Sequence, residues 1–186
     1  MRILGPLLVV AALLALLVGW LTFSGMSARI QPGAVESYFA RTLQRLSIPK
    51  SARSLKNPME STPDALVEAR RHFADHCAGC HANDGGGKTE MGQNLYPRVP
   101  DMRLPATQNL SDGELYYIIE NGIRFTGMPA WGHGGWDDHE TWHLVLFIRH
   151  LPHLTGEDLN DMKGHNPRSP ADIREEQLEE DFLNGR

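Results

Sequence analysis

The sequence predicts an all-α protein in which one uncharged apolar helix precedes a small helical domain. Three observations favour this fold class. Residues 3–23 form a run without a charged residue, and 17 of these 21 residues are hydrophobic. Further along the chain, apolar residues recur at the three- and four-residue spacing of helices in several segments. No segment shows the alternation of apolar and polar residues that is typical of a half-buried strand.

Length and charge exclude several classes of protein. The 186 residues carry a net charge of −5 and are 41% hydrophobic. This balance excludes a multi-pass membrane protein, a disordered chain and a basic nucleic-acid-binding protein, so no nucleic acid is expected as a partner. We expect an N-terminal anchor at 1–25, a basic spacer at 26–61, one domain at 62–154 and an acidic tail at 155–186.

The N-terminal run is long enough to cross the hydrocarbon core of a membrane as one helix. A signal peptide has a shorter apolar core followed by a cleavage site of small residues, and residues 24–28 match such a site poorly. We therefore expect an uncleaved, single transmembrane helix. A cleaved signal peptide and a buried core helix are the alternatives.

The segments on either side of the domain carry opposite charges. Residues 29–58 hold six basic residues and one acidic residue, a net of +5, and residues 157–186 hold nine acidic and four basic residues, a net of −5. The basic segment can contact anionic lipid headgroups. We favour instead a short helix folded against the domain with its basic face in water. For the acidic segment we favour a solvated tail over a short helix near 173–183.

The first helix of the domain leads into a cysteine motif. Thr62 suits the N-cap and Pro63 the first turn, and the helix is expected to run into Cys77. Three prolines between residues 97 and 105 then indicate an extended, non-helical stretch.

Two further helices are expected in the second half of the domain. Ser111 and Glu114 have the spacing of a capping box, and the helix that they open should end at residues 121–122, Asn-Gly. A last helix is expected from about Asp137 to His150, closed by a proline two residues later.

Residues 77–81 read Cys-Ala-Gly-Cys-His, the C-x-x-C-H signature of c-type haem attachment. Cys77 and Cys80 can form thioethers with the haem, and His81 can reach the iron as an axial ligand. Three alternatives are less favoured. A zinc site would need a second pair of ligands, and a thioredoxin-like site would need a βαβ pattern. A disulfide between these two cysteines would be strained. We expect one covalently attached haem c, located outside the cytoplasm.

The second axial ligand is expected to be Met128. It lies in a loop of sequence Phe-Thr-Gly-Met-Pro-Ala-Trp between two predicted helices. Pro129 favours an extended conformation for Met128, so its thioether can point inward. A lone methionine more often fills a core. A histidine ligand is the alternative, and the candidates are His133, His139 and His143.

These motifs resemble the class I mono-haem cytochromes c, and more narrowly the haem domains grouped with the cbb3-oxidase cytochrome c subunits. The matching segments are 77–81 with the Asp-Gly-Gly-Gly that follows, 110–115, 127–131 and the last helix. The resemblance covers residues 63 to 153 and implies a small class I cytochrome c helical fold around one haem. It also implies that the helix before Cys77 crosses the last helix near the haem.

The resemblance further implies which residues surround the haem. A proline carbonyl should accept a hydrogen bond from His81, and Pro97 is the nearest candidate, with Pro100 as the alternative. An arginine can pair with a haem propionate, and the candidates, for which solvent exposure is the alternative, are Arg98, Arg103 and Arg124. Trp131 and Tyr96 can pack near the macrocycle, with ordinary core packing as the alternative.

Together these observations predict a membrane-anchored electron carrier rather than an enzyme. With His81 and Met128 both bound, the iron has no open position, and methionine ligation raises its potential. We expect a single-pass protein of the cytoplasmic membrane with the haem domain on the periplasmic side. Expected partners are a quinol-oxidising complex, a terminal oxidase or a periplasmic dehydrogenase. The alternatives are a fixed haem subunit of a dehydrogenase or oxidase complex, and a haem-based sensor or peroxidase if Met128 binds weakly.

Overall fold

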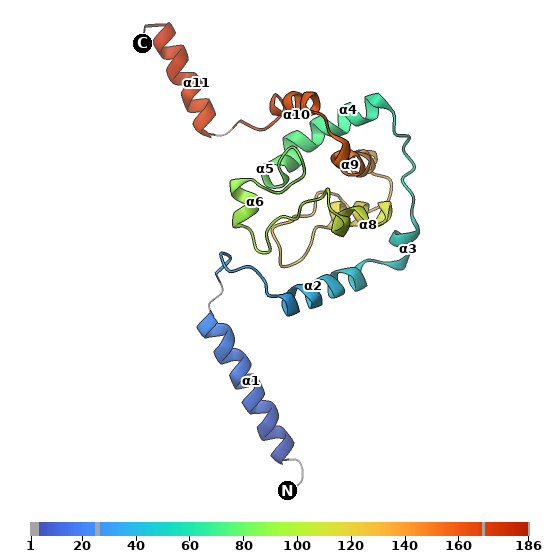
Figure 1. Ribbon diagram of the computed structural model, residues 1–186, viewed down its shortest axis with the longest axis vertical. Coiled ribbons are helices and arrows are strands. Elements are labelled where there is room, and N and C mark those ends of the chain that lie inside the picture. Colours follow the sequence, from blue (N-terminus) through green and yellow to red (C-terminus); the bar gives the residue numbers. More distant parts are fainter. Residues whose placement is uncertain (1–3, 25–26, 169, 186) are drawn as a thin grey trace.

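The computed structural model describes residues 4–24, 27–168 and 170–185, except for the side chains of residues 21, 24 and 170–172. The described residues form helices and loops, with no strand among them, so the all-α class is confirmed for this part of the chain. Figure 1 shows a helical body from which α1 (Leu4–Ser24) and α11 (Pro170–Leu183) project at opposite ends.

Helix α1 coincides with the apolar run of the sequence. The large apolar side chains that the structure describes in it are exposed, from 50% at Leu17 upwards. Within the described part of the chain, no helix is both long and apolar enough to cross a membrane. The single transmembrane helix expected over residues 1–25 is therefore not confirmed and stays a prediction, and residues 1–3 and 25 lie outside the described residues.

The expected spacer contains two helices, α2 (Ala34–Ser47) and α3 (Lys50–Ser54). The expected helix is present in α2, and its arginines are exposed as expected. None of its residues is buried, however, so the apolar side chains of α2 are not packed against the domain. Burial begins just after it, at Ile48 (3% exposed) and Ala52 (0%).

The helix that leads to the cysteine motif begins as expected. The Thr62 hydroxyl accepts a hydrogen bond from the amide of Ala65, and Pro63 opens α4 (Pro63–His72). The helix continues through a π-helical turn, η1 (Phe73–Cys77), into α5 (Ala78–His81). The whole motif is therefore carried on one continuous helical segment.

Two short helices, α6 (Glu90–Asn94) and α7 (Pro105–Gln108), flank the proline-rich stretch. Neither was expected from the sequence. The residues between them are extended or in turns, as their prolines indicate.

The expected capping box opens α8 (Asp112–Asn121): the Ser111 hydroxyl accepts from the Glu114 amide, and the Glu114 carboxylate accepts from the Ser111 amide. The helix ends at Gly122, as expected. The last expected helix is α9 (His139–His150), which begins slightly later than predicted because Asp138 acts as its cap.

The core of the domain lies where these helices meet. Helix α4 packs against α9, and α8 packs against both α9 and α3. The expected contact between the helix before Cys77 and the last helix is thus present. The largest fully buried side chains are those of Phe73, Tyr116, Trp142, Val145, Phe147 and Met162.

The beginning of the expected acidic tail belongs to the domain. After a short 3-10 turn, η2 (Leu151–His153), the chain forms α10 (Gly156–Lys163), and Met162 within it is 0% exposed. Arg70 of α4 pairs with Asp158 and, at 2.9 Å, with Asp161. A solvated tail over 155–186 is therefore wrong for α10. The short helix that was the alternative near 173–183 is present as α11, and its described side chains are exposed.

Candidate functional site

The two cysteines lie at the end of η1 and within α5, both partly buried and neither in a disulfide. Burial, with a smaller contribution from the neighbouring Cys80, raises the pKa of the Cys77 thiol to about 12. Burial also raises the pKa of Cys80. Both groups are therefore protonated thiols at neutral pH. They lack the thiolate character of a redox or nucleophilic cysteine.

His81 ends α5 beside the ring of Phe73, with the two ring centroids 6.4 Å apart. Burial lowers the pKa of its imidazole to about 4, so the ring is neutral at pH 7 and a nitrogen lone pair is available to a metal. Its Nδ1 is buried and has no hydrogen-bond partner among the described residues. The expected hydrogen bond to the carbonyl of Pro97 or Pro100 is therefore not formed in this structure.

Helix α6 packs directly against the motif. The Thr89 hydroxyl, which caps α6, donates to the carbonyl oxygen of Cys80 over 3.1 Å. The sulfurs of Cys80 and Met91 lie 3.2 Å apart. A Cβ atom on Gly92 would clash with the same Cys80 carbonyl. The sequence indicated no such contact, although Thr89 has the position of a helix cap before Glu90.

Met128 is half-buried in the loop that follows α8. Its amide donates to the Thr126 hydroxyl over 3.1 Å, and its carbonyl accepts from the amide of Ile123 over 3.1 Å. These two bonds fix the backbone on both sides of the thioether side chain.

Two contacts bring this loop against the segments that flank the cysteine motif. Gly127 lies against the side chain of Leu95, which a Cβ atom there would approach to 2.6 Å. On the other side, the ring of Trp131 meets the ring of His76 edge-on, at 5.9 Å between centroids. Leu95 follows α6, which packs on Cys80, and His76 precedes Cys77. Met128 therefore lies in the chain between two residues, Gly127 and Trp131, that contact segments flanking the motif.

The expected propionate partners differ in what they contact. Arg103 pairs with Asp84 and with Asp101, each at 2.7 Å, so its charge is already matched by carboxylates. Arg98 is exposed, and its Nε donates to the carbonyl oxygen of Gln93 over 3.2 Å. Arg124, also exposed, lies in the Met128 loop.

The remaining expected neighbours lie at the edge of this region. Pro97 is exposed and follows a cis peptide bond with Tyr96. The Tyr96 hydroxyl donates to Glu36 of α2, and this hydrogen bond is the main cause that raises the pKa of Tyr96. Trp131 is 44% exposed in addition to its contact with His76.

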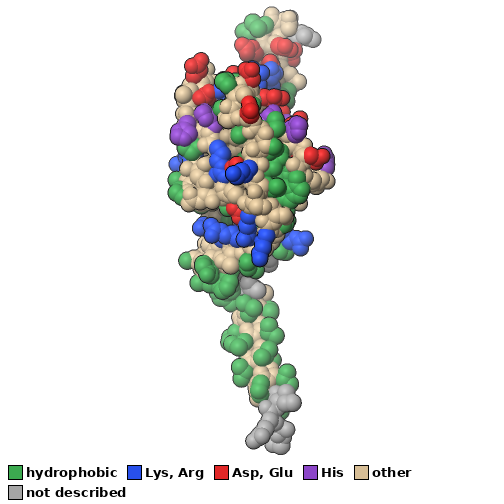
Figure 2. Space-filling model, turned by 90° about the vertical axis from the view of Figure 1, so that its right-hand side faces the viewer, with side chains coloured by type: hydrophobic (Ala, Val, Ile, Leu, Met, Phe, Trp, Pro, Cys, Tyr) green, Lys and Arg blue, Asp and Glu red, His purple; other side chains and the backbone are tan. Residues whose placement is uncertain are grey.

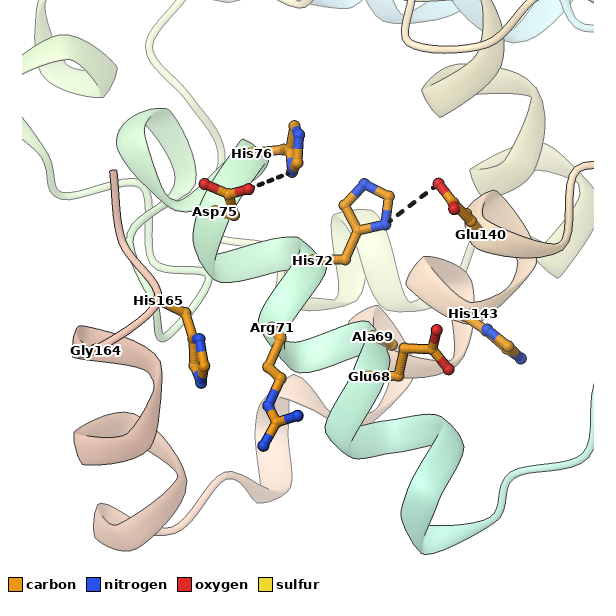
Figure 3. Close-up of a pocket in the computed structure, with 10 residues that line it drawn as sticks. All are labelled: Glu68, Ala69, Arg71, His72, Asp75, His76, Glu140, His143, Gly164 and His165. Atoms are coloured by element: carbon orange, nitrogen blue, oxygen red, sulfur yellow. Dashed lines mark ion pairs between the residues drawn. The ribbon is translucent and has the colours of Figure 1, made fainter. Parts of the chain in front are cut away.

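A pocket of about 540 Å³ is lined by residues of α4, η1 and α9 and by the residues that follow α10; His76 lines it, but residues 77–81 do not. Figure 3 shows that its histidine rings point in different directions: His72 faces Glu140, at 3.9 Å, and His76 faces Asp75, at 3.4 Å. His143, one of the alternative iron ligands, also lines this pocket. No group of three or more His, Cys, Asp or Glu residues in the described part of the chain could hold a metal ion.

The motif and the loop therefore fit a covalently held haem. Two neutral thiols and a neutral imidazole with an unpaired buried nitrogen share one helical segment, and the Met128 loop lies beside it. Haem iron accepts the imidazole and thioether donors that these residues offer.

Comparison with known families agrees with this fit. Residues 64–148, just under half of the chain, match the family model described as "Cytochrome C oxidase, cbb3-type, subunit III". The match supports a class I cytochrome c haem domain in this segment, which implies a haem c cofactor and haem-based electron transfer. No curated protein matched the chain.

Proposed function

We propose that residues 62–154 hold one haem c and transfer single electrons outside the cytoplasm. The observation that carries this proposal is the position of the Met128 loop. The loop contacts His76, which precedes the Cys-x-x-Cys-His segment, and Leu95, which follows it in the chain. The family match over residues 64–148 supports it independently.

In this proposal Cys77 and Cys80 hold the haem through thioether bonds, and His81 and Met128 are the axial ligands. When bound, the haem supplies an iron that alternates between the Fe(III) and Fe(II) states. A thioether ligand from Met128 would favour the reduced state of the iron and so raise its potential. Because both axial positions are taken by the protein, the chain acts as a carrier and has no site on the iron for a substrate.

The core behind the motif packs on the half-buried imidazole of His81. Phe73, 1% exposed, lies beside His81 and packs on Phe147 at 5.0 Å between ring centroids. Both phenylalanines belong to the packed contact of α4 and its continuation with α9. An apolar surrounding controls the access of solvent to a metal site and so tunes its potential.

A double variant with Cys77→Ser and Cys80→Ser tests the cofactor and its attachment. The unaltered chain, expressed with the machinery for c-type maturation, should retain haem after denaturation, and the variant should lose it. A redox titration of the unaltered chain should show one reversible one-electron transition. A chain without such a transition would contradict the proposed function.

We also propose that residues 1–25 anchor the domain in the cytoplasmic membrane as a single pass, with the haem domain on the periplasmic side. Support comes from the uncharged run of 21 residues, which includes Ile3 and Leu21, whose side chains lie outside the described part. Anchoring raises the concentration of a carrier near membrane-bound redox partners. Extraction of membranes at alkaline pH tests the anchor, because an anchored chain stays with the lipid fraction.

The redox partners that we propose are a quinol-oxidising complex, a terminal oxidase or a periplasmic dehydrogenase. The description of the matching family, a subunit of an oxidase, favours a second candidate function: a fixed haem subunit of such a complex. Gentle solubilisation separates the two, because a fixed subunit co-purifies with oxidase subunits and a free carrier does not.

A further inference from the structure

Helix α2 presents its large apolar side chains on one face, and that face is exposed. Four of them recur at intervals of three or four along the chain, and Tyr38 follows Val35 by three residues, so all five share one side of the helix. Their exposed fractions run from 59% to 73%. They are Val35, Tyr38, Phe39, Leu43 and Leu46.

The opposite face of α2 is turned toward the domain. Ser37 and Gln44, which lie across the helix from the apolar face, are half-buried. Near its start, Glu36 accepts a hydrogen bond from the Tyr96 hydroxyl, and the Gln31 side chain accepts one from the amide of Arg98 over 3.0 Å. The usual arrangement of a surface helix, with the apolar face inward, is thus reversed.

The other end of α2 is held as well. Ile48 and Ala52, just after it, are buried at 3% and 0% exposure. The Arg53 guanidinium donates to the carbonyl of Arg45, and it pairs with Glu114 of α8 at 3.6 Å. Helix α2 is therefore fixed at both ends, and its apolar face cannot turn inward without the loss of these contacts.

Cations lie next to the exposed apolar face. Figure 2 shows Lys and Arg side chains gathered at the end of the domain from which α1 extends, next to hydrophobic side chains. The basic residues of this part of the chain are exposed, against a single acidic residue, Glu36: Arg29, Arg41, Arg45, Lys50, Arg53 and Lys56. Nine residues separate the end of α1 from the start of α2, and they span at most about 30 Å.

We propose that α2 lies in the surface of the membrane, with its apolar face among the lipids and its cations at anionic phospholipid headgroups. This inference rests on the membrane anchor proposed above. An exposed apolar helical face flanked by arginines is typical of interfacial helices, and anionic headgroups attract such cations. The contacts of Glu36 with Tyr96 and of Gln31, just before α2, with Arg98 then hold the domain in one orientation on the bilayer.

Photo-crosslinking in the full chain tests this inference. A diazirine amino acid replaces Phe39 on the apolar face, Gln44 on the opposite face or Leu13 in α1, one position at a time. Each protein is reconstituted in vesicles of equimolar phosphatidylcholine and phosphatidylglycerol, illuminated and analysed by mass. We expect phospholipid adducts at Phe39 at least severalfold above those at Gln44, and fewer at Phe39 in phosphatidylcholine alone.

Each of the other possible outcomes contradicts one part of the inference. Water adducts at Phe39 would exclude its insertion among the lipids, and cross-links to a second copy or another protein would assign the face to that partner. Equal lipid adducts at Phe39 in both vesicle types would remove the role of the anionic headgroups. The probe at Leu13 tests the anchor independently of this inference. Water adducts at Leu13 would contradict the anchor, whereas the adducts at Phe39 test whether α2 lies in the membrane surface.

Discussion

The amide of Ile123 donates to the carbonyl oxygen of Met128 over 3.1 Å and closes the loop that follows α8. At the base of this loop lies Gly122, with φ of +63°. A Cβ atom on Gly122 would lie 2.5 Å from the carbonyl carbon of Pro129 and 2.7 Å from the carbonyl oxygen of Met128. The end of α8 therefore sets the position of the proposed iron ligand.

Substitution Gly122→Ala should displace the Met128 segment and weaken its ligation of iron. Its positive φ alone costs about 1–2 kcal/mol for a residue with a Cβ. We expect a lowered potential and partial binding of CO by the reduced protein. Gly134→Ala is the matched control, because Gly134 also has a positive φ (+82°) but nothing lies near its Cβ position. If both variants bind CO to the same extent, the contact between Gly122 and the loop does not position the ligand.

Substitution Met128→Ala should lower the potential by on the order of 0.1 V, because axial ligands set haem potentials over a range of about 0.8 V. The reduced variant should also bind CO at the freed position. Met91→Ala is the control, since the Met91 sulfur lies 3.2 Å from that of Cys80 and so also lies beside the motif. If Met91→Ala changes the potential and Met128→Ala does not, the assignment of the ligand is reversed.

Substitution Thr141→Val should destabilise the domain by about 1–3 kcal/mol, the cost of a buried polar group left without its partner. The Thr141 hydroxyl donates to Oε1 of Glu120 over 2.8 Å, and these residues are 4% and 3% exposed. Urea denaturation measures the change. Thr42→Val, whose hydroxyl bonds to the backbone of its own helix, should change stability by less than about 0.5 kcal/mol. Equal effects of the two variants would show that the buried hydrogen bond between Thr141 and Glu120 adds no more to stability than an ordinary hydrogen bond within a helix.

Substitution Met162→Ala should lower the free energy of unfolding by about 2–4 kcal/mol, because Met162 is fully buried. Leu178→Ala in α11, where the side chain is 65% exposed, should leave it almost unchanged. Thermal or urea unfolding of the two variants tests whether α10, and not α11, is part of the domain. A Met162→Ala variant as stable as the unaltered chain would show that α10 belongs to a solvated tail and not to the domain.

Local signals in the sequence predict the ends of the helices well. Thr62 and Ser111 cap their helices as expected, because a cap depends on residues only three positions apart. The same signal is present at Thr155 and Asp158, which form a capping box at the start of α10. This pair indicates that the domain extends beyond residue 154, where the expected domain ends.

Contacts between distant segments could not be predicted in this way. Nothing near His76 in the sequence indicates that its ring meets Trp131, and nothing near Leu95 indicates that it packs on Gly127. The outward direction of the apolar face of α2 also depends on tertiary contacts, such as that between Tyr96 and Glu36. Periodicity identifies an apolar face but not what covers it.

Absorption spectra of the full chain, oxidised and reduced, with and without CO, test the central claim most directly. One covalently bound haem with His81 and Met128 as axial ligands should give low-spin spectra, and CO should leave the reduced spectrum unchanged. A chain without a haem spectrum would contradict the haem site at Cys77 and Cys80. A reduced haem that binds CO readily in the unaltered protein would contradict Met128 as a firm ligand.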